Sequence, residues 1–239
     1  MPDKRVKTMG KHSGRYTALA EKVDKTRYYD PKEAIALVKE LASAGFDETV
    51  EVAIKLGVDP NKGEQNVRGS LVLPHGTGKV PRVAVFAEGE AAQAAKEAGA
   101  DRVGGEDLIA AIDEGWEEFD ILVAHPAMMR FVGKLGRKLG PRMPNKKAGN
   151  ITDDVGAAVE NLKAGKIEFR VDRGAVVRLG IGKVSFTEQQ LAENLASLMG
   201  SILAARPGGI QGRYVVSGVI SSSMGPGMKL NVRQLTGSA

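Results

Sequence analysis

A run of hydroxyl, glycine and proline residues near the C-terminus is the part of this sequence best suited to chemistry. The run is Ser221-Ser222-Ser223-Met224-Gly225-Pro226-Gly227, and it follows a strand-like segment over 213–220. Because side chains alternate along a strand, Ser217, Ser221 and Ser223 are expected on one face. Hydroxyls beside the bare backbone of a Gly-Pro-Gly turn suit phosphates, sugar hydroxyls and base edges. The plainer alternative is an edge strand that ends in a turn.

A second candidate is a basic stretch broken by glycine and proline, which is therefore more than one charged helix face. Its cationic side chains are Lys134, Arg137, Lys138, Arg142, Lys146 and Lys147. We interpret them as RNA or partner contacts, placed in the second domain or at the hinge. The alternative is an ordinary surface loop at the domain seam. Aromatic residues make up only 5% of the chain, so a broad base-stacking platform is not expected.

Catalytic chemistry has no credible residue set here. The segment Gly76-Thr77-Gly78-Lys79 resembles the end of a phosphate-binding loop but precedes a strand, and the carboxylates of Glu88 and Glu90 would repel a pyrophosphate. The chain has three widely separated histidines and no serine in a nucleophile elbow. We therefore expect no enzyme activity, no cofactor and no metal.

Length and composition indicate a globular protein. The 239 residues, 42% of them apolar, suit two domains, although one large domain is also compatible with this length. Cysteine is absent, which fits a reducing compartment. The start of the chain lacks the apolar core of a secretory signal, and no apolar run approaches the roughly 18 residues of a membrane span. The expectation is a cytoplasmic protein without a membrane association.

The charge is distributed unevenly along the chain, although the net charge is only +5. Residues 76–129 hold four bases and eleven acids, residues 130–147 hold seven bases and no acid, and both chain ends are basic. This pattern suggests one polyanion-binding unit built from both ends of the chain. Ordinary solvated surface is the competing interpretation.

The predicted elements change character twice. An antiparallel α+β pattern occupies both ends, whereas buried strands alternate with helices in the middle, which is typical of a parallel sheet. The fold class expected is therefore α+β with an inserted α/β unit, a discontinuous two-domain protein. Residues 1–75 and 165–239 form the antiparallel-sheet domain, with residues 1–14 as a flexible basic arm. Residues 76–164 form a Rossmann-like parallel-sheet domain.

Several segments, in order along the chain from about Tyr16, resemble the bacterial type of the large-subunit ribosomal protein L-one family. The motifs that carry the resemblance are Phe46-Asp47-Glu48-Thr49-Val50-Glu51-Val52, Gln65-Asn66-Val67-Arg68-Gly69, Leu73-Pro74-His75-Gly76-Thr77-Gly78-Lys79, Leu139-Gly140-Pro141-Arg142, Gly165-Lys166-Ile167-Glu168-Phe169-Arg170 and Met224-Gly225-Pro226. Two departures stand out: the loop after Arg142 is two residues shorter than the family pattern, and serines replace its threonines at 221–223.

The resemblance implies a discontinuous first domain and a Rossmann-like second domain inserted at a hinge. It also implies a structural protein of the large ribosomal subunit that binds 23S-type rRNA at the mobile stalk, close to exit-site tRNA. Such proteins assist release of deacylated tRNA, and many repress translation of their own operon mRNA. A protein that is monomeric when free and otherwise resides on the cytoplasmic ribosome is expected.

Site residues follow from the resemblance position by position. The family's RNA-contacting segment matches Ser223, Met224 and Gly225, its strand serine matches Ser217, and its contacting phenylalanine matches Phe46, which by pattern alone is equally a core residue. The polar positions of the flanking strands complete the candidate RNA site: Glu51, Lys55, Lys166, Glu168, Arg170, Asp172 and Ser221. A nucleotide-dependent enzyme using the inserted unit is the runner-up. A DNA-binding protein is third, since no helix-turn-helix pattern occurs.

Overall fold

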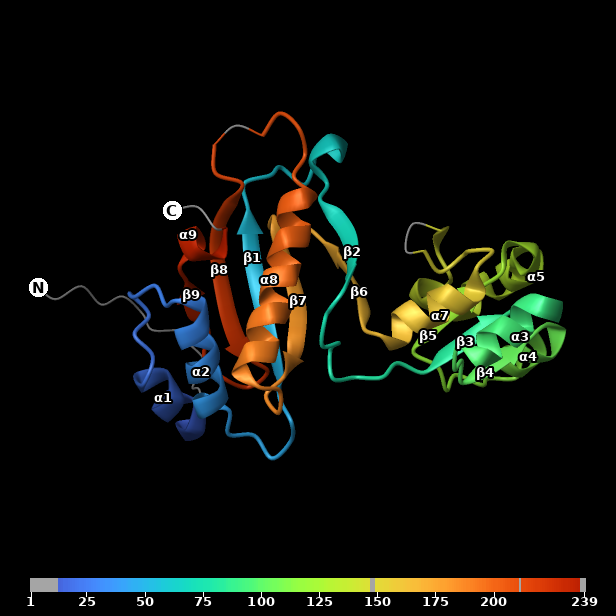
Figure 1. Cartoon of the computed structure of the whole chain (residues 1–239), viewed down its shortest axis with the longest axis horizontal. Coiled ribbons are helices and arrows are strands. Elements are labelled where there is room, and N and C mark those ends of the chain that lie inside the picture. The colour runs from blue at the N-terminus through green and yellow to red at the C-terminus, as the bar shows by residue number, and fades with distance from the viewer. Residues whose placement is uncertain (1–12, 147–148, 211, 237–239) are drawn as a thin grey trace, which may run out of the picture.

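The structure is a computed structural model that describes residues 13–146, 149–210 and 212–236. Its elements form two groups joined by two chain segments, as Figure 1 shows. Most of the expected arm at 1–14 lies outside the described residues. Gly14, however, already belongs to helix α1 (Gly14–Glu21), which Ser13 caps by accepting a hydrogen bond from the Tyr16 N–H. The last residue of the expected arm is therefore helical.

The larger group is built on an antiparallel sheet in the order β7-β1-β8-β9. These strands are β1 (Thr49–Leu56), β7 (Val176–Lys183), β8 (Val215–Ser222) and β9 (Met228–Leu230). A separate antiparallel pair is formed by β2 (Arg68–Val72) and β6 (Lys166–Arg170). Strands from both ends of the sequence thus pair with one another, as β1 does with β7 and β8.

Helices cover one face of this sheet (Figure 1). They are α2 (Pro31–Leu41) and α8 (Glu188–Ala204), with α1 beside α2 and the short α9 (Val232–Leu235) near the sheet edge. A capping box between Thr187 and Gln190 starts α8, because each side chain satisfies a free backbone N–H of the first turn. The inward faces of helices and strands merge into one hydrophobic core that includes Ile54, Leu191 and Ile220.

The smaller group is a parallel sheet in the order β4-β3-β5, covered on both faces. Its strands are β3 (Val83–Phe86), β4 (Arg102–Gly104) and β5 (Ile121–Ala124); its principal helices are α3 (Gly89–Glu97), α4 (Glu106–Asp113) and α7 (Val155–Lys163). In β3, Ala84 and Phe86 face one core while Val83 and Val85 face the other. The expected fold class, an α+β protein with an inserted parallel α/β unit, is confirmed.

The basic stretch after Pro126 forms a chain of short turns instead of one helix. The turns are η2 (Pro126–Met128), α5 (Met129–Val132), η3 (Gly133–Leu135), α6 (Gly136–Leu139) and η4 (Gly140–Arg142). A further short 3-10 turn, η1 (Gly63–Gln65), lies between β1 and β2. Glycine is a poor helix former, and new turns begin at Gly133, Gly136 and Gly140. Leu135 and Leu139 nevertheless lie in the hydrophobic core.

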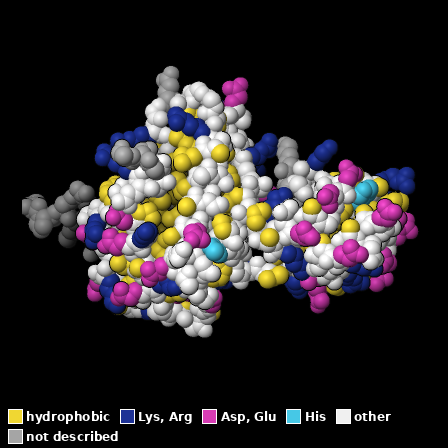
Figure 2. All heavy atoms as spheres, viewed as in Figure 1, with side chains coloured by type: hydrophobic (Ala, Val, Ile, Leu, Met, Phe, Trp, Pro, Cys, Tyr) yellow, Lys and Arg dark blue, Asp and Glu magenta, His cyan; other side chains and the backbone are white. Residues whose placement is uncertain are grey.

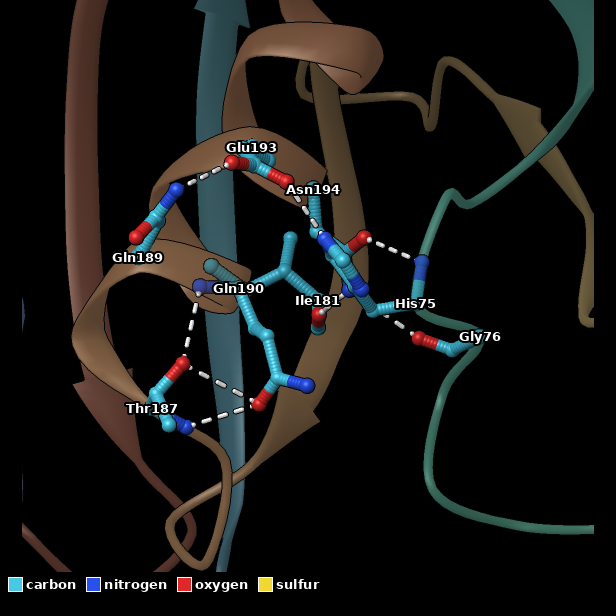
Figure 3. Close-up of polar contacts among 8 residues, drawn as sticks. All are labelled: His75, Gly76, Ile181, Thr187, Gln189, Gln190, Glu193 and Asn194. Carbon is cyan, nitrogen blue, oxygen red and sulfur yellow. Dashed lines mark hydrogen bonds and ion pairs between the residues drawn. The ribbon is translucent and has the colours of Figure 1, made fainter.

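The two segments that join the groups touch at two glycines. A Cβ placed on Gly165 would lie 2.6 Å from the Gly76 Cα, and both glycines have positive φ, so neither position accommodates a larger residue without strain. Figure 3 shows how α8 holds this place: the buried Asn194 side chain accepts from the His75 N–H (3.1 Å) and donates to Gly76 O (3.0 Å) and Ile181 O (2.7 Å). The start of the first crossing segment is thereby fastened to the larger group.

Candidate nucleic-acid interface

The side of the four-stranded sheet opposite α2 and α8 carries the predicted polar strand residues. Lys55 pairs across the ladder with Ser217, and Glu51 pairs with Ser221. Glu51 and Lys55 are exposed, and the two serines are half-buried. The alternation expected from the sequence thus brings these four side chains together on what we call the open face.

Two cationic residues of the open face were not singled out by sequence reasoning. Arg178 on β7 lies opposite Ala53, and Lys229 on β9 lies opposite Val219; both are exposed. Each occupies a position whose side chain points to the open face when side chains alternate along its strand. The alternation could therefore have identified both residues from the sequence. The sequence did not show which strands are neighbours in the sheet. The order β7-β1-β8-β9 is what brings these residues close to Lys55 and Ser217.

The predicted residues of β6 lie on the separate β2–β6 pair. Lys166, Glu168 and Arg170 alternate with the half-buried Ile167 and the buried Phe169. Lys166 faces Val72 across the ladder, Glu168 faces Ser70, and Arg170 faces Arg68. The structure therefore places them beside the main sheet and not within it, with the two basic positions at the two ends of the strand.

Asp172 has a positioning role that its sequence pattern did not show. Its carboxylate accepts from the N–H groups of Val176 (2.9 Å) and Gly174 (2.8 Å), and it pairs with Arg178 at 2.9 Å. The Val176 N–H, followed by the Gly174 N–H and the Arg178 charge, holds the pKa of Asp172 below its ordinary value. The Asp172 carboxylate therefore binds the backbone of its own turn, and it orients Arg178 at the margin of the open face.

Two loops at one end of the sheet present large apolar side chains to solvent. Phe46 is 58% exposed and Met224 is 50% exposed, so Phe46 is not a core residue. Ser223 joins the loops to the sheet, since its hydroxyl accepts from the Thr49 N–H (3.1 Å) and donates to Thr49 O (3.3 Å). These apolar groups are thus available for contact at the end of the open face where β1 begins and β8 ends.

A buried carboxylate fastens the two loops together, and sequence reasoning missed it. Glu48 is 2% exposed; its Oε1 accepts from the N–H groups of Ser43 (3.1 Å) and Ala44 (3.0 Å), and its Oε2 accepts from that of Met224 (2.9 Å). Burial alone raises the pKa of Glu48, but these donors outweigh it and hold the pKa below its ordinary value. The neighbouring Ser222 hydroxyl acts in the same direction, although it falls short of hydrogen-bond geometry.

Arg15 of α1 bridges the same two loops from outside. Its guanidinium donates to the Ser43 hydroxyl (2.8 Å) and to Met224 O (3.1 Å). The planar fork of arginine suits such a double contact. Together, Glu48 from within and Arg15 from α1 fix the relative positions of the loops that carry Phe46 and Met224.

Gly225 packs against the protein's own Ser222 side chain. A Cβ at this position would lie 2.5 Å from the buried Ser222 Oγ. A residue larger than glycine would first have to turn the Ser222 hydroxyl aside, so a substitution at Gly225 tests packing as well as RNA contact. Phe46, Met224 and Ser223 are the better positions at which to test contact.

The cationic residues predicted in the basic stretch lie in the smaller group, and several are already paired. Lys138 pairs with Asp113 at 2.5 Å and Arg142 with Glu117 at 3.6 Å. Lys134, Arg137 and Lys146 form no ion pair within the described ranges, and Lys147 lies outside them. This stretch forms a less basic surface than the sequence suggests. Its α5 part lies on the far side of the smaller group (Figure 1), whereas its end returns toward β6, since a Cβ on Gly149 would lie 3.0 Å from the Lys166 Nζ.

A metal site or a membrane span would need particular features among the described residues. No group of three or more His, Asp or Glu side chains is arranged there to hold a metal ion. None of the described helices combines the length and apolar character needed to cross a membrane. At the carboxyl end of the parallel sheet, the Glu88 carboxylate lies against Gly105, whose N–H is bound by Asp107 (2.8 Å). An acidic edge of this kind disfavours a phosphate ligand.

Comparison with known proteins points in one direction. Residues 38–226 match the model of the ribosomal protein L1p/L10e family. Over 225 residues the chain is 52% identical to the large ribosomal subunit protein uL1 of Lactobacillus acidophilus, covering 93% of this chain and 98% of that protein. It is 50% identical to the protein of the same name from Lactobacillus delbrueckii subsp. bulgaricus, over 93% of this chain and 97% of that protein.

Proposed function

The chain belongs to the ribosomal protein L1p/L10e family, and from that premise we propose that it is a component of the large ribosomal subunit that binds rRNA through the open face and its two loops. Membership of this family makes it a ribosomal protein and not an enzyme. The cytoplasmic ribosome is accordingly its place of action. We extend the proposal to the 23S-type rRNA of the mobile stalk.

One observation carries the proposal: Glu48 fixes two loops so that Phe46 and Met224 project into solvent beside a face lined with hydroxyls and cations. RNA recognition uses aromatic side chains to stack unpaired bases, hydroxyls to meet the ribose 2′-OH, and Lys or Arg to hold phosphates. The open face supplies all three with Phe46, Ser217, Ser221, Lys55 and Arg178. Because the loops are fastened beforehand, little conformational entropy is lost on binding.

Three finer parts of the proposal rest on the family resemblance. They are contact with exit-site tRNA during release of deacylated tRNA, repression of the protein's own operon mRNA, and a monomeric state when free. The two-group architecture supports the first, since the smaller group extends from the RNA-binding group and adds basic residues such as Lys134 and Arg137 (Figure 1). The second requires only that the mRNA present the same contacts as the rRNA.

The test is the affinity of the full chain for a stalk rRNA fragment. Losing a stacked base costs about 1–3 kcal/mol, so Phe46→Ala should weaken binding roughly 5- to 100-fold. Met224→Ala should give a smaller loss. Val80→Ala is the matched control, because Val80 is 70% exposed but lies on a joining segment. Unchanged affinity for Phe46→Ala and Met224→Ala alike would move the RNA site elsewhere.

A further inference from the structure

A pocket lies at the end of the sheet far from Phe46 and Met224, on the side that the helices cover. It has a volume of about 610 Å³. Its floor is apolar, formed by Leu203, Tyr214, Val215 and Val232, with the half-exposed Val216 beside them. Its volume falls within the range of small-ligand sites, and polar side chains such as Asn231 and Thr236 complete its lining.

Three arginines surround this floor. Arg206, Arg213 and Arg233 line the pocket, all are exposed, and no Asp or Glu lines it with them. Within the part of the chain that the structure describes, none of the three forms an ion pair. Arg206 lies over the Tyr214 ring, 5.7 Å from its centroid, while it donates to Ile210 O (3.2 Å). We call this site the arginine pocket.

The upper end of the larger group, where β8 begins, carries Lys and Arg side chains in the space-filling view (Figure 2), with an acidic side chain at its margin. Figure 2, which shows the helix-covered side, has Lys and Arg side chains at the upper end of the larger group next to a hydrophobic strip. The sequence explains this excess of positive charge, since no acidic residue follows Glu193. An unpaired positive charge of this density attracts polyanions.

The arginine pocket is continuous with the open face around the edge of the sheet. Tyr28 lines the pocket and is 61% exposed. The Lys229 ammonium, which belongs to the open face, lies 5.9 Å from the centroid of the Tyr28 ring. A strand of RNA on the open face can therefore pass this edge while keeping aromatic and cationic contacts.

We infer that the arginine pocket binds one unpaired nucleotide of the RNA that occupies the open face, an inference that rests on the proposed function. Arginine forks match phosphate oxygens with two parallel hydrogen bonds, and the three guanidinium groups can hold the flanking phosphates. The base enters the apolar floor and stacks on Tyr28 or on the exposed plane of Arg206. The RNA thus contacts the domain at both ends of β8.

The experiment uses the full chain and the 5′-phosphorylated trinucleotide UUU, followed by amide chemical shifts. A trinucleotide is too short to reach the Met224 loop from the pocket, because the eight residues of β8 at about 3.3 Å each separate the two ends. Saturable shifts at Tyr28, Val216 and Val232 are expected. Arg213→Ala with Arg233→Ala should weaken them at least fivefold, whereas the control pair Lys96→Ala and Arg102→Ala, on exposed bases of the smaller group outside the candidate RNA contacts, should not.

Three results would overturn the inference: no saturable shift at millimolar trinucleotide, shifts confined to the Phe46 and Met224 loops, or a hexaglutamate peptide that binds the pocket more tightly than the trinucleotide. The last would identify an acidic protein segment as the ligand. The proposed function is tested by a separate measurement, the affinity of the Phe46→Ala and Met224→Ala variants for stalk rRNA. Those variants leave the arginine pocket intact.

Discussion

At the scale of single residues, the proposed RNA site depends on a buried carboxylate, Glu48, which faces the protein's own backbone. Glu48 accepts three backbone N–H groups from two loops, and no cation pairs with it among the described residues. A buried charge is costly unless hydrogen bonds satisfy it, and here they are supplied by the loops that it must position. Arg15 repeats the connection from the surface with weaker, exposed bonds.

Glu48→Gln should lower the free energy of unfolding by about 1–3 kcal/mol at pH 7, because the amide presents N–H groups where it must accept them. Its affinity for stalk rRNA should fall as well, since the two loops lose their common anchor. Urea unfolding and RNA titration measure the two effects. Glu51→Gln, which changes an exposed carboxylate on β1, is the control for stability.

The same residue sets a pH dependence. A folded-state pKa below the ordinary value of 4.5 means that Glu48 contributes stability above that pH, and that this contribution is lost as the pH falls through the folded-state pKa. The stability difference between the wild type and Glu48→Gln should therefore shrink below about pH 4.5. A difference that stays constant from pH 7 to pH 3 would show that the carboxylate charge is not responsible.

At the scale of elements, α8 has a second role beside covering the sheet. Its buried Asn194 holds the His75–Gly76 segment and β7 at one point, while the neighbouring Glu193 pairs with the His75 ring at 2.5 Å on the exposed side (Figure 3). Gly78 also packs against Phe186. We therefore propose that bending between the groups occurs beyond residue 78 and at Gly165, and not at His75 or Gly76.

Asn194→Ala should destabilise the protein by about 3 kcal/mol, because it leaves the buried Ile181 carbonyl and the part-buried His75 N–H and Gly76 carbonyl without their partner. Glu193→Gln should change stability by no more than about 0.5 kcal/mol, since its partner is a solvent-accessible histidine. Urea unfolding compares the two. Small-angle scattering should detect a broader range of inter-group distances for Asn194→Ala alone. If the two variants lowered the free energy of unfolding equally, Asn194 would not be the residue that holds the His75–Gly76 segment.

At the scale of the whole molecule, the proposed RNA site and the inserted unit lie in separate hydrophobic cores. The core of the larger group draws on both ends of the chain, whereas the two cores of the smaller group involve only residues between 83 and 162. The two crossings meet at Gly76 and Gly165, so the larger group can be closed by a very short link.

A chain that joins residues 1–76 to 165–239 through a short glycine linker should fold and keep its affinity for stalk rRNA within tenfold. Binding should weaken steeply with salt, with a log–log slope of about −0.7 for each phosphate neutralised on single-stranded RNA. Circular dichroism checks the fold and filter binding the affinity. A folded fragment that binds more than tenfold more weakly would place essential contacts in the smaller group.

The sequence alone determined whatever depends on neighbours along the chain. Alternation placed Ser217 and Ser221 on one face, the Thr187–Gln190 capping box started α8, and the change from alternating to buried strands revealed the inserted parallel sheet. Each of these signals is local, because strand period, helix capping and burial on both sides of a strand act within a few residues.

Only the tertiary structure decided which distant residues meet. Glu48 looks like any surface acid in the sequence, yet the return of β8 brings the Met224 N–H to it. Asn194 reads as a polar helix position until the first crossing passes over it. The arginine pocket joins Tyr28 to residues 203–236. These sites depend on strand order and chain crossing, and a residue's type and near neighbours carry no record of either.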